Sequence, residues 1–460
     1  MDKLANLIFD LDRWSDKCFK DSVFIKFISL VFNGLQNCSN NQLLRNIVSI
    51  FLIISFYILF TSLSLPQFSN DRFGIGIIIL TSFLFFLLSI FFNNSNKNIT
   101  FNIIDLLILV LFITAIISTF NSYFFKESLV GLFKYMLFFI WYLIARISLI
   151  KFSEKQLIYL ITFLYIICLC TSIYGIYQFL IGVEPLATWE DPNIESTHTR
   201  VYSTIGNPNL LAGYILSILP FGFILPLINN HQKILKLFFL FSCIPITACL
   251  IFTGSRGGYI GLIVIFIFCI FAMGIYLYKK YNYSKHLIFI FALSFISLLS
   301  CLLFFFFPVF TERLATIFTF REDSSNSFRI NVWYACLKML KENWLTGIGP
   351  GNSTFNLVYG LYMTSGFDSL GSYNIFLEIA IQIGIIACFI FTFILLISFV
   401  KLHKLFWSKG SLLAFGIGLS FVGILTQGLF DTVFFRPQIF IIFWFLLAAI
   451  GKLEDITSKG

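Results

Sequence analysis

Twelve long apolar runs constrain this chain more than any other feature of its sequence. Each run is close to the length, about 20 residues, that an α-helix needs to cross the hydrocarbon core of a bilayer. The chain is 58% hydrophobic and 12% charged, so little of it remains for a second, water-soluble domain. The sequence therefore predicts an all-α polytopic membrane protein with about 12 transmembrane helices. The expected spans are 47–65, 73–92, 103–121, 129–149, 157–181, 209–228, 235–253, 257–278, 286–308, 372–400, 411–434 and 437–450.

The flanking segments complete the expected domain organisation. We expect a cytoplasmic or interfacial arm over 1–45, a transmembrane domain over 46–451 and a short tail over 452–460. The apolar stretch Val23–Phe32 is too short to span and no small-residue cleavage site follows it, so it predicts an amphipathic helix on the membrane surface rather than a signal peptide. A long loop over 309–371 separates two of the spans.

The distribution of basic residues predicts the orientation. An even number of spans puts both termini on one side, and the segments on that side hold about 20 basic residues against about 11 on the other. We therefore expect a multi-pass protein of the bacterial inner (plasma) membrane with both termini in the cytoplasm and the long loop in the periplasm. The net charge of +9 follows from this bias, and no nucleic-acid partner is expected.

Arginine is concentrated in the segments predicted to lie outside. Lysine or arginine serves topology equally well, but the planar arginine fork binds phosphate and carboxylate in two-point fashion. The bias predicts an anion site on the outer face, the alternative being ordinary ion pairs within loops. The outer arginines are Arg72, Arg200, Arg256, Arg313, Arg321, Arg329 and Arg436.

The turn Thr253–Gly258 is so short that Arg256 is expected at the outer membrane surface. Gly257 and Gly258 then open the next helix, whose N-terminus adds partial positive charge. Both effects favour an anion there. The alternative is a tight helical hairpin with a snorkelling arginine.

The long loop contains an expected helix from Ser327 to Glu342. Phe328, Val332, Ala335 and Met339 share one face and predict an apolar stripe, with Ser327 as N-cap. Arg329 falls in the first turn, an unfavourable place for a cation, and Trp333 is positioned to stack beneath it. The helix is either a lid that carries Arg329 to an anion or a docked surface helix. The glycine-rich run 346–352 that follows is a turn cluster able to form a backbone anion nest.

The outer segment Gly182–Asn209 holds further polar candidates. His198 is the only histidine expected outside, and it is a candidate base or an ordinary solvated side chain. Asn207 or Asn209 is expected to cap the following span. Four carboxylates in this segment match no standard metal-binding loop, so we expect no metal and no cofactor.

Several of these motifs, in this order, resemble the O-antigen ligase/polymerase-related membrane family over roughly residues 160–445. The chain looks closest to the branch named for bicarbonate transport and inorganic-carbon accumulation. The matching pieces are Gly206–Ala212, Ser255–Gly257, Arg329 with Trp333, Gly347–Asn352 and Ser372–Glu378, and for the branch Ala187–Trp189, Asp191–Asn193, Arg200–Tyr202 and Leu377–Ala380.

The ligases of this family resemble metal-independent inverting glycosyltransferases that use a polyprenyl-pyrophosphate-linked glycan in polysaccharide biosynthesis. The resemblance implies that Arg256 and Arg329 hold the pyrophosphate. Where ligases have a histidine before the asparagine that opens the next span, this chain has Tyr373 before Asn374. A phenol with an ordinary pKa near 10 is a poor base at neutral pH, which argues against classical ligase activity but leaves anion binding intact.

Three functions follow: a glycan-transfer enzyme, a transporter of a small anion such as bicarbonate, and a binding protein that kept the pocket without the chemistry. The expected partners are a lipid-linked glycan or small anion, together with membrane lipids. The candidate catalytic residues are His198 and Tyr373, and the candidate substrate-binding residues are Arg256, Arg329, Arg200, Trp333, Asn207 and Asn374.

Overall fold

The computed structural model describes residues 2–21, 42–65, 72–92, 101–186, 200–228, 233–281 and 324–459. The expected surface helix Val23–Phe32, the expected span 286–308 and His198 lie outside these ranges. Every regular element in the described ranges is helical, and six helices there are long and apolar enough to cross a membrane. A polytopic all-α membrane protein is therefore the architecture that the structure supports.

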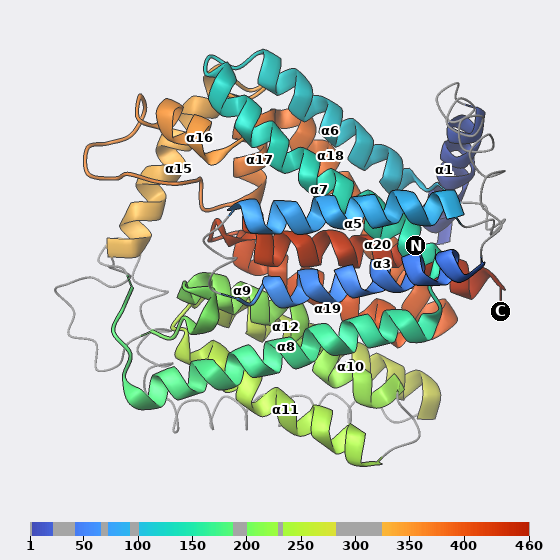
Figure 1. The fold of residues 1–460 in the computed structure, drawn as a ribbon. Coiled ribbons are helices and arrows are strands. Elements are labelled where there is room, and N and C mark those ends of the chain that lie inside the picture. Colours follow the sequence, from blue (N-terminus) through green and yellow to red (C-terminus); the bar gives the residue numbers. More distant parts are fainter. Residues whose placement is uncertain are drawn as a thin grey trace.

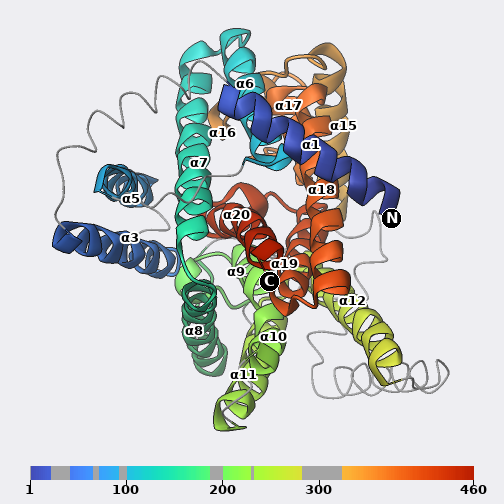
Figure 2. The same ribbon diagram turned by 90° about the vertical axis from the view of Figure 1, so that its right-hand side faces the viewer.

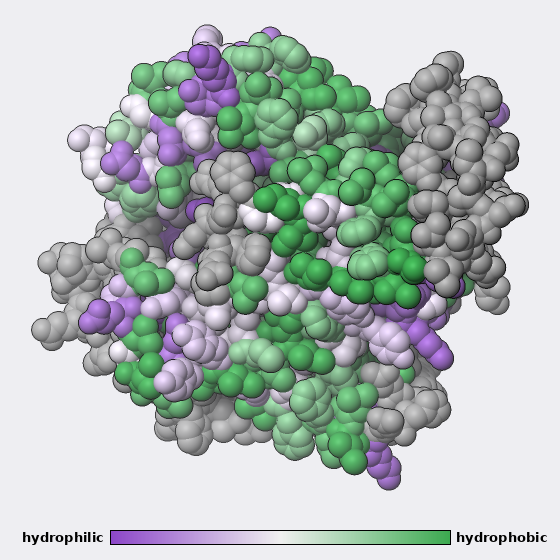
Figure 3. Space-filling view, in the orientation of Figure 1, coloured by the Kyte–Doolittle hydropathy of each residue, from purple (hydrophilic) through white to green (hydrophobic). Residues whose placement is uncertain are grey.

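Helices occupy eleven of the twelve predicted spans, and the twelfth is the one outside the described ranges. They run side by side along the bundle (Figure 1), and Figure 3 shows hydrophobic residues over its flank with hydrophilic residues gathered toward the ends. The helices are α3 (Gln42–Ser62), α5 (Arg72–Phe92), α6 (Ile103–Phe120), α7 (Phe125–Lys151), α8 (Glu154–Ile181), α9 (Pro208–Ile218), α10 (Pro220–Ile228), α11 (Lys233–Phe252), α12 (Arg256–Tyr281), α17 (Ile375–Ile383), α18 (Ile385–Lys409), α19 (Leu412–Gly428) and α20 (Pro437–Lys459).

Helix α20 is the centre of the bundle, although the sequence predicted only a short final span over 437–450. It continues to Lys459, and its apolar residues from Ile439 to Ile450 are almost completely buried. It packs along α7, and Figure 2 shows it surrounded by its neighbours. The helix is longer than the predicted span because its last turns carry polar residues that the hydropathy pattern excluded.

Two predicted spans are interrupted. The span 209–228 consists of α9 and α10, which follow each other directly at Pro220, where the missing N–H breaks the helical ladder. The span 372–400 consists of α17 and α18, which are separated by Gly384 at φ 98°. A side chain at Gly384 would meet the backbone oxygen of Leu345 at 2.1 Å, so the chain approaches the break too closely for any other residue.

The two ends of the bundle differ. Helix α1 (Asp2–Asp21) and the end of α20 lie together at one end, called here the termini end (Figure 1). The opposite, loop end carries α15 (Ser324–Glu342) and α16 (Asn352–Tyr359). The termini therefore lie on one side, as an even number of spans predicts.

Helix α15 confirms the predicted loop helix and corrects its start. Val332, Ala335 and Met339 are buried in a small core that also includes Phe355 of α16, and Phe328 packs against this core, so the predicted apolar stripe is correct. The helix begins at Ser324, so Ser327 lies in its first turn and is not the N-cap. Arg329 therefore stands beyond the first turn, where the helix dipole weighs little against a cation.

Candidate functional site

A cavity of about 440 Å³ lies at the loop end between α5, α7, α9 and the connection from α19 to α20. Helices α5 and α7 contribute the apolar side chains Ile75, Ile79, Leu137 and Phe138. Lys134 lies on α7 beside these apolar side chains, and the remaining lining residues supply a second cation, one carboxylate, four amides and a phenol. These remaining side chains are Asn207, Asn209, Asn352, Tyr373, Asp431, Arg436 and Gln438.

Asn207 positions the start of α9 at the cavity. Its side-chain oxygen accepts from the N–H groups of Asn209 at 2.9 Å and Leu210 at 3.0 Å, which confirms it as the predicted N-cap. The side chain of Asn209 in turn accepts from Arg200 Nη2 at 2.6 Å. Arg200 Nε donates to the backbone oxygen of Thr253 at 2.8 Å, so Arg200 joins the cavity wall to the hairpin turn before α12.

Asp431 is the carboxylate of the cavity and is 6% exposed. It lies between α19 and the short 3-10 helix η2 (Val433–Phe435), and its Oδ1 accepts from the N–H of Thr432 at 2.7 Å. Burial raises its pKa above the ordinary value of 3.8, while the charges of Arg329 and Arg200 oppose that rise. Arg200 and Arg329, which sequence reasoning selected, therefore both act electrostatically on one buried acid.

Arg329 reaches this acid from α15. Its Nε donates to the backbone oxygen of Phe430 at 2.9 Å, one residue before Asp431. Its guanidinium carbon lies 5.7 Å from the centre of the Tyr373 ring. The ring found under the guanidinium is thus Tyr373 rather than the expected Trp333, which is half-buried on α15.

Tyr373 lines the cavity at an unusual backbone angle, φ 54°. Burial raises its pKa above 10 and the nearby Asp431 adds to the rise, while Arg329 opposes it. The phenol therefore stays protonated at neutral pH, where it donates a hydrogen bond and is a poor proton acceptor.

Asn374 begins α17. Its side-chain oxygen accepts from the N–H groups of Phe376 and Leu377, both at 3.0 Å, and its Nδ2 donates to the backbone oxygen of Leu429 at 3.2 Å. These bonds fix the start of α17 beside Tyr373, and contact between Asn374 and a substrate stays a prediction.

Arg256 is half-buried at the first position of α12, and the Ser255 side chain accepts from the N–H of Gly258 at 3.2 Å to cap that helix. The cavity wall in the described ranges does not include Arg256. Its proposed meeting with Arg329 over one anion stays a prediction, as does the role of His198.

The glycine-rich run closes the break between α17 and α18. Ile348 N donates to the oxygen of Ile381 at 2.8 Å, and Gly349 N donates to the oxygen of Gln382 at 3.0 Å. Gly351 N donates to the side-chain oxygen of Gln382 at 2.9 Å. These N–H groups satisfy the end of α17, so they are not the free donors that an anion nest requires.

Sequence reasoning selected Arg200, Asn207 and Tyr373 but missed Lys134 and Asp431 as site residues. The missed residues lie inside or at the edge of predicted spans, where the hydropathy of the surrounding apolar residues hides a single charged side chain. Asp431 was placed inside the span 411–434, although α19 ends at Gly428. A carboxylate inside an apparent span is itself a functional signal, because such a group is costly in lipid. In the described ranges, no three His, Cys, Asp or Glu side chains come together to hold a metal ion.

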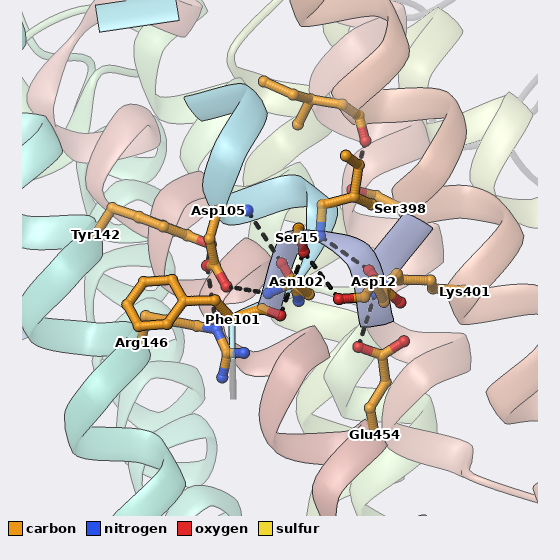
Figure 4. A network of polar contacts seen from close by, with 12 residues as sticks. Asp12, Ser15, Phe101, Asn102, Asp105, Tyr142, Arg146, Ser398, Lys401 and Glu454 are labelled. Atoms are coloured by element: carbon orange, nitrogen blue, oxygen red, sulfur yellow. Dashed lines mark hydrogen bonds and ion pairs between the residues drawn. The ribbon is translucent and has the colours of Figure 1, made fainter. Parts of the chain in front are cut away.

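A second polar cluster lies at the termini end (Figure 4). Asp105 Oδ1 accepts from the hydroxyl of Tyr142 at 2.5 Å and from Arg146 Nε at 3.2 Å. Lys401, 4% exposed, pairs with Asp12 at 2.8 Å and Glu454 at 3.0 Å. The pair of Asp105 and Arg146 joins α6 to α7, a contact that depends on the fold.

Residues 239–392 match the family model of the O-antigen ligases (Wzy_C). The match runs from α11 into α18 and includes Arg256, Arg329 and Tyr373, whereas Arg200, Asp431 and Arg436 lie outside it. No curated protein matches the chain. The stretch that carries α12, α15 and the break between α17 and α18 is thus similar to the O-antigen ligase family, within an apolar, many-helix chain.

Proposed function

We propose that the cavity at the loop end binds a glycan linked through pyrophosphate to a polyprenyl lipid and transfers the glycan to an acceptor hydroxyl. The observation that carries this proposal is the mixed lining of the cavity, in which apolar side chains of α5 and α7 lie together with Lys134, Arg436 and several amide side chains. A lipid-linked phosphate needs apolar side chains to contact its polyprenyl chain and cations to bind its phosphates at the same site. The O-antigen ligase match over 239–392 agrees with this class of substrate.

The cations supply the countercharge for the phosphates. Lys134 and Arg436 line the cavity, and Arg329 and Arg200 act on Asp431 from beside it. In the transfer, charge develops on the departing pyrophosphate oxygen, and nearby cations stabilise it. Arg256, within the matched stretch, is a further candidate for the same group.

Asp431 is the base that we assign. In the proposed step its carboxylate takes the proton of the acceptor hydroxyl while that oxygen forms a bond to the anomeric carbon. The bond from this carbon to the pyrophosphate oxygen breaks from the opposite side, which inverts the configuration. The lipid pyrophosphate leaves with its electron pair, and the proton passes from Asp431 to water. Tyr373, kept protonated by its raised pKa, is placed to donate a hydrogen bond.

Small-anion transport, as in the branch named for bicarbonate, is the second candidate. The observation that favours it is the pair of interrupted helices α9/α10 and α17/α18, since secondary transporters often build ion sites at broken helices. The first helix of each pair begins beside a residue that lines the cavity, Asn207 or Tyr373.

A reconstituted comparison tests both candidates. Purified protein in proteoliposomes is assayed for consumption of a polyprenyl-pyrophosphate glycan and, separately, for bicarbonate flux. We expect glycan transfer that is lost in Asp431→Asn and kept in Lys341→Ala, a change on α15 away from the cavity wall. Bicarbonate flux without glycan consumption would overturn the enzyme and establish the transporter.

A further inference from the structure

Helix α1 has three different faces. Ile8, Asp12, Ser15 and Phe19 recur at helical spacing on one face, and Ile8 and Ser15 are 5% and 4% exposed. The charged residues Asp10, Arg13 and Lys17 recur on a second face, and all three are exposed. Between these two faces runs an apolar row, at the spacing i, i+4, i+7, i+11. The row is Leu7, Leu11, Trp14 and Cys18, with Leu7 57% and Trp14 55% exposed.

The rotation of α1 about its own axis is fixed by polar bonds. Asp12 Oδ1 accepts from the N–H of Ile103 at 2.8 Å, and its Oδ2 pairs with Lys401 at 2.8 Å. Asp16 Oδ1 accepts from the N–H of Phe101 at 3.2 Å. Helix α1 is thus held to α6 and α18, and the apolar row cannot turn inward without breaking these bonds.

The bonds also place α1 at the membrane boundary. Ile103, which donates to Asp12, is the first residue of α6, a helix long and apolar enough to span. Both views show α1 crossing the end of the bundle at a steep angle to the helices that run along it (Figures 1 and 2). This level and angle match those of a helix in the plane of the interface between lipid and water.

We propose that α1 is an in-plane helix whose row Leu7, Leu11, Trp14 and Cys18 is embedded in the lipid of the leaflet at the termini end. Its three faces match the three surroundings at that position: protein, lipid and water. Tryptophan is the residue that membrane proteins favour at this depth, because its ring is apolar and its N–H is polar. The charged row then faces water, where Arg13 and Lys17 are solvated.

Spin labels distinguish lipid from water at single positions of the complete protein. A ketone-bearing amino acid is introduced at Leu7 or Trp14, or at the matched controls Asp10 or Arg13, and is coupled to a nitroxide, so that native cysteines are left in place. The protein is reconstituted in vesicles of phosphatidylcholine and phosphatidylglycerol. Collision rates with oxygen, which concentrates in lipid, and with a water-soluble nickel chelate are measured for each label.

We expect a severalfold higher ratio of oxygen to nickel collisions at positions 7 and 14 than at positions 10 and 13. Equal ratios at all four positions would overturn the proposal. Dipolar broadening between labels at position 7 would also overturn it, because a second copy of the chain would then cover the row. The two independent pairs keep the test decisive if one labelled variant fails to fold.

Discussion

At the scale of single residues, the fork of Arg329 connects the long loop to the rest of the site. It donates to the chain beside Asp431, lies over the ring of Tyr373 and lowers the pKa of both groups. A lysine at this position would keep the charge but lose the planar fork and its fixed hydrogen bond. The identity of the cation therefore matters as much as its charge.

Arg329→Ala and Arg256→Ala should each reduce glycan transfer to a small residual rate while the protein still inserts into the membrane normally. Arg329→Lys and Arg256→Lys should restore little of the rate, because an ammonium group does not make the two-point contact. Initial rates with the lipid-linked donor check this, with Lys341→Ala as the matched control on α15. Full activity in both lysine variants would contradict two-point recognition of the phosphates.

Asp431 gives a prediction about pH. If its carboxylate is the base, transfer rises with pH as the group loses its proton, and the rise occurs above the ordinary value of 3.8 because burial raises the pKa. Arg329→Ala removes a charge that lowers this pKa, so the rising limb of any residual activity should move to higher pH. Rate profiles measured from pH 4 to pH 9, roughly the range that such shifts cover, check this. An unmoved limb in Arg329→Ala would exclude Asp431 as its origin.

The same shift in pKa has the opposite sign for stability. The folded-state pKa of Asp431 is above its unfolded value, so the folded protein binds this proton more tightly than the unfolded chain does. The contribution to stability is present below the unfolded value and is lost as pH rises through the folded one. The ionisation that activates the base therefore costs stability.

The candidate site was predictable where a motif stands out from its surroundings. Asn207 followed by Pro208 is typical of the start of a helix, and Arg200 lies among polar residues of an outer segment. Asp431 and Lys134 are embedded in apolar sequence, and only the fold brings them to one cavity. The aromatic partner of Arg329 could not be predicted from the sequence either. Tyr373 is far from Arg329 along the chain, whereas Trp333 is four residues away.

At the scale of elements, the break between α17 and α18 organises the loop end. The last carbonyls of α17 accept from the glycine-rich run, and Ile385 N at the start of α18 donates to the oxygen of Trp344 at 2.8 Å. Backbone hydrogen bonds therefore hold the loop to the helices of the bundle. Sequence reasoning found the glycines but assigned them to an anion, because a single sequence does not show which helix end they satisfy.

Gly384→Ala should destabilise the loop end strongly. Its φ of 98° is strained for any side chain, and the added carbon would meet the Leu345 oxygen at 2.1 Å. A strained residue of this kind costs about 1–3 kcal/mol, and displacement of the loop adds to that cost. Thermal unfolding in detergent measures the loss. Gly418→Ala, a glycine of α19 with open space around it, is the matched control and should change stability little. Equal effects of the two changes would contradict the role of the break.

At the scale of the whole molecule, hydropathy predicted the positions of the helices along the chain well and their packing against one another poorly. Apolar runs mark the helices because a segment in lipid must satisfy all its backbone hydrogen bonds internally, as an α-helix does. The central place of α20 was not visible, since a helix buried among others and one facing lipid have the same composition. The pairing of Asp12 with Lys401, 389 positions away along the chain, likewise depends on the final packing.

Lys401 is the residue through which the two ends of the chain are joined, and its replacement gives the last prediction. Lys401→Met leaves Asp12 and Glu454 facing each other without their shared cation. Loss of one partner of a fully buried ion pair costs about 3–5 kcal/mol, and the cost is expected to be lower here because the remaining carboxylates are 18% and 26% exposed. The midpoint of thermal unfolding should fall in proportion, and a protease should then cut α1 more rapidly, because this helix loses its ion pair with α18. Lys409→Met, at the exposed end of the same helix, is the control and should leave both measurements unchanged.

The triple change Lys401→Met, Asp12→Asn and Glu454→Gln should recover part of the loss, since it removes the repulsion along with the pair. No recovery in the triple variant would show that the lysine acts through packing of its stem rather than through its charge.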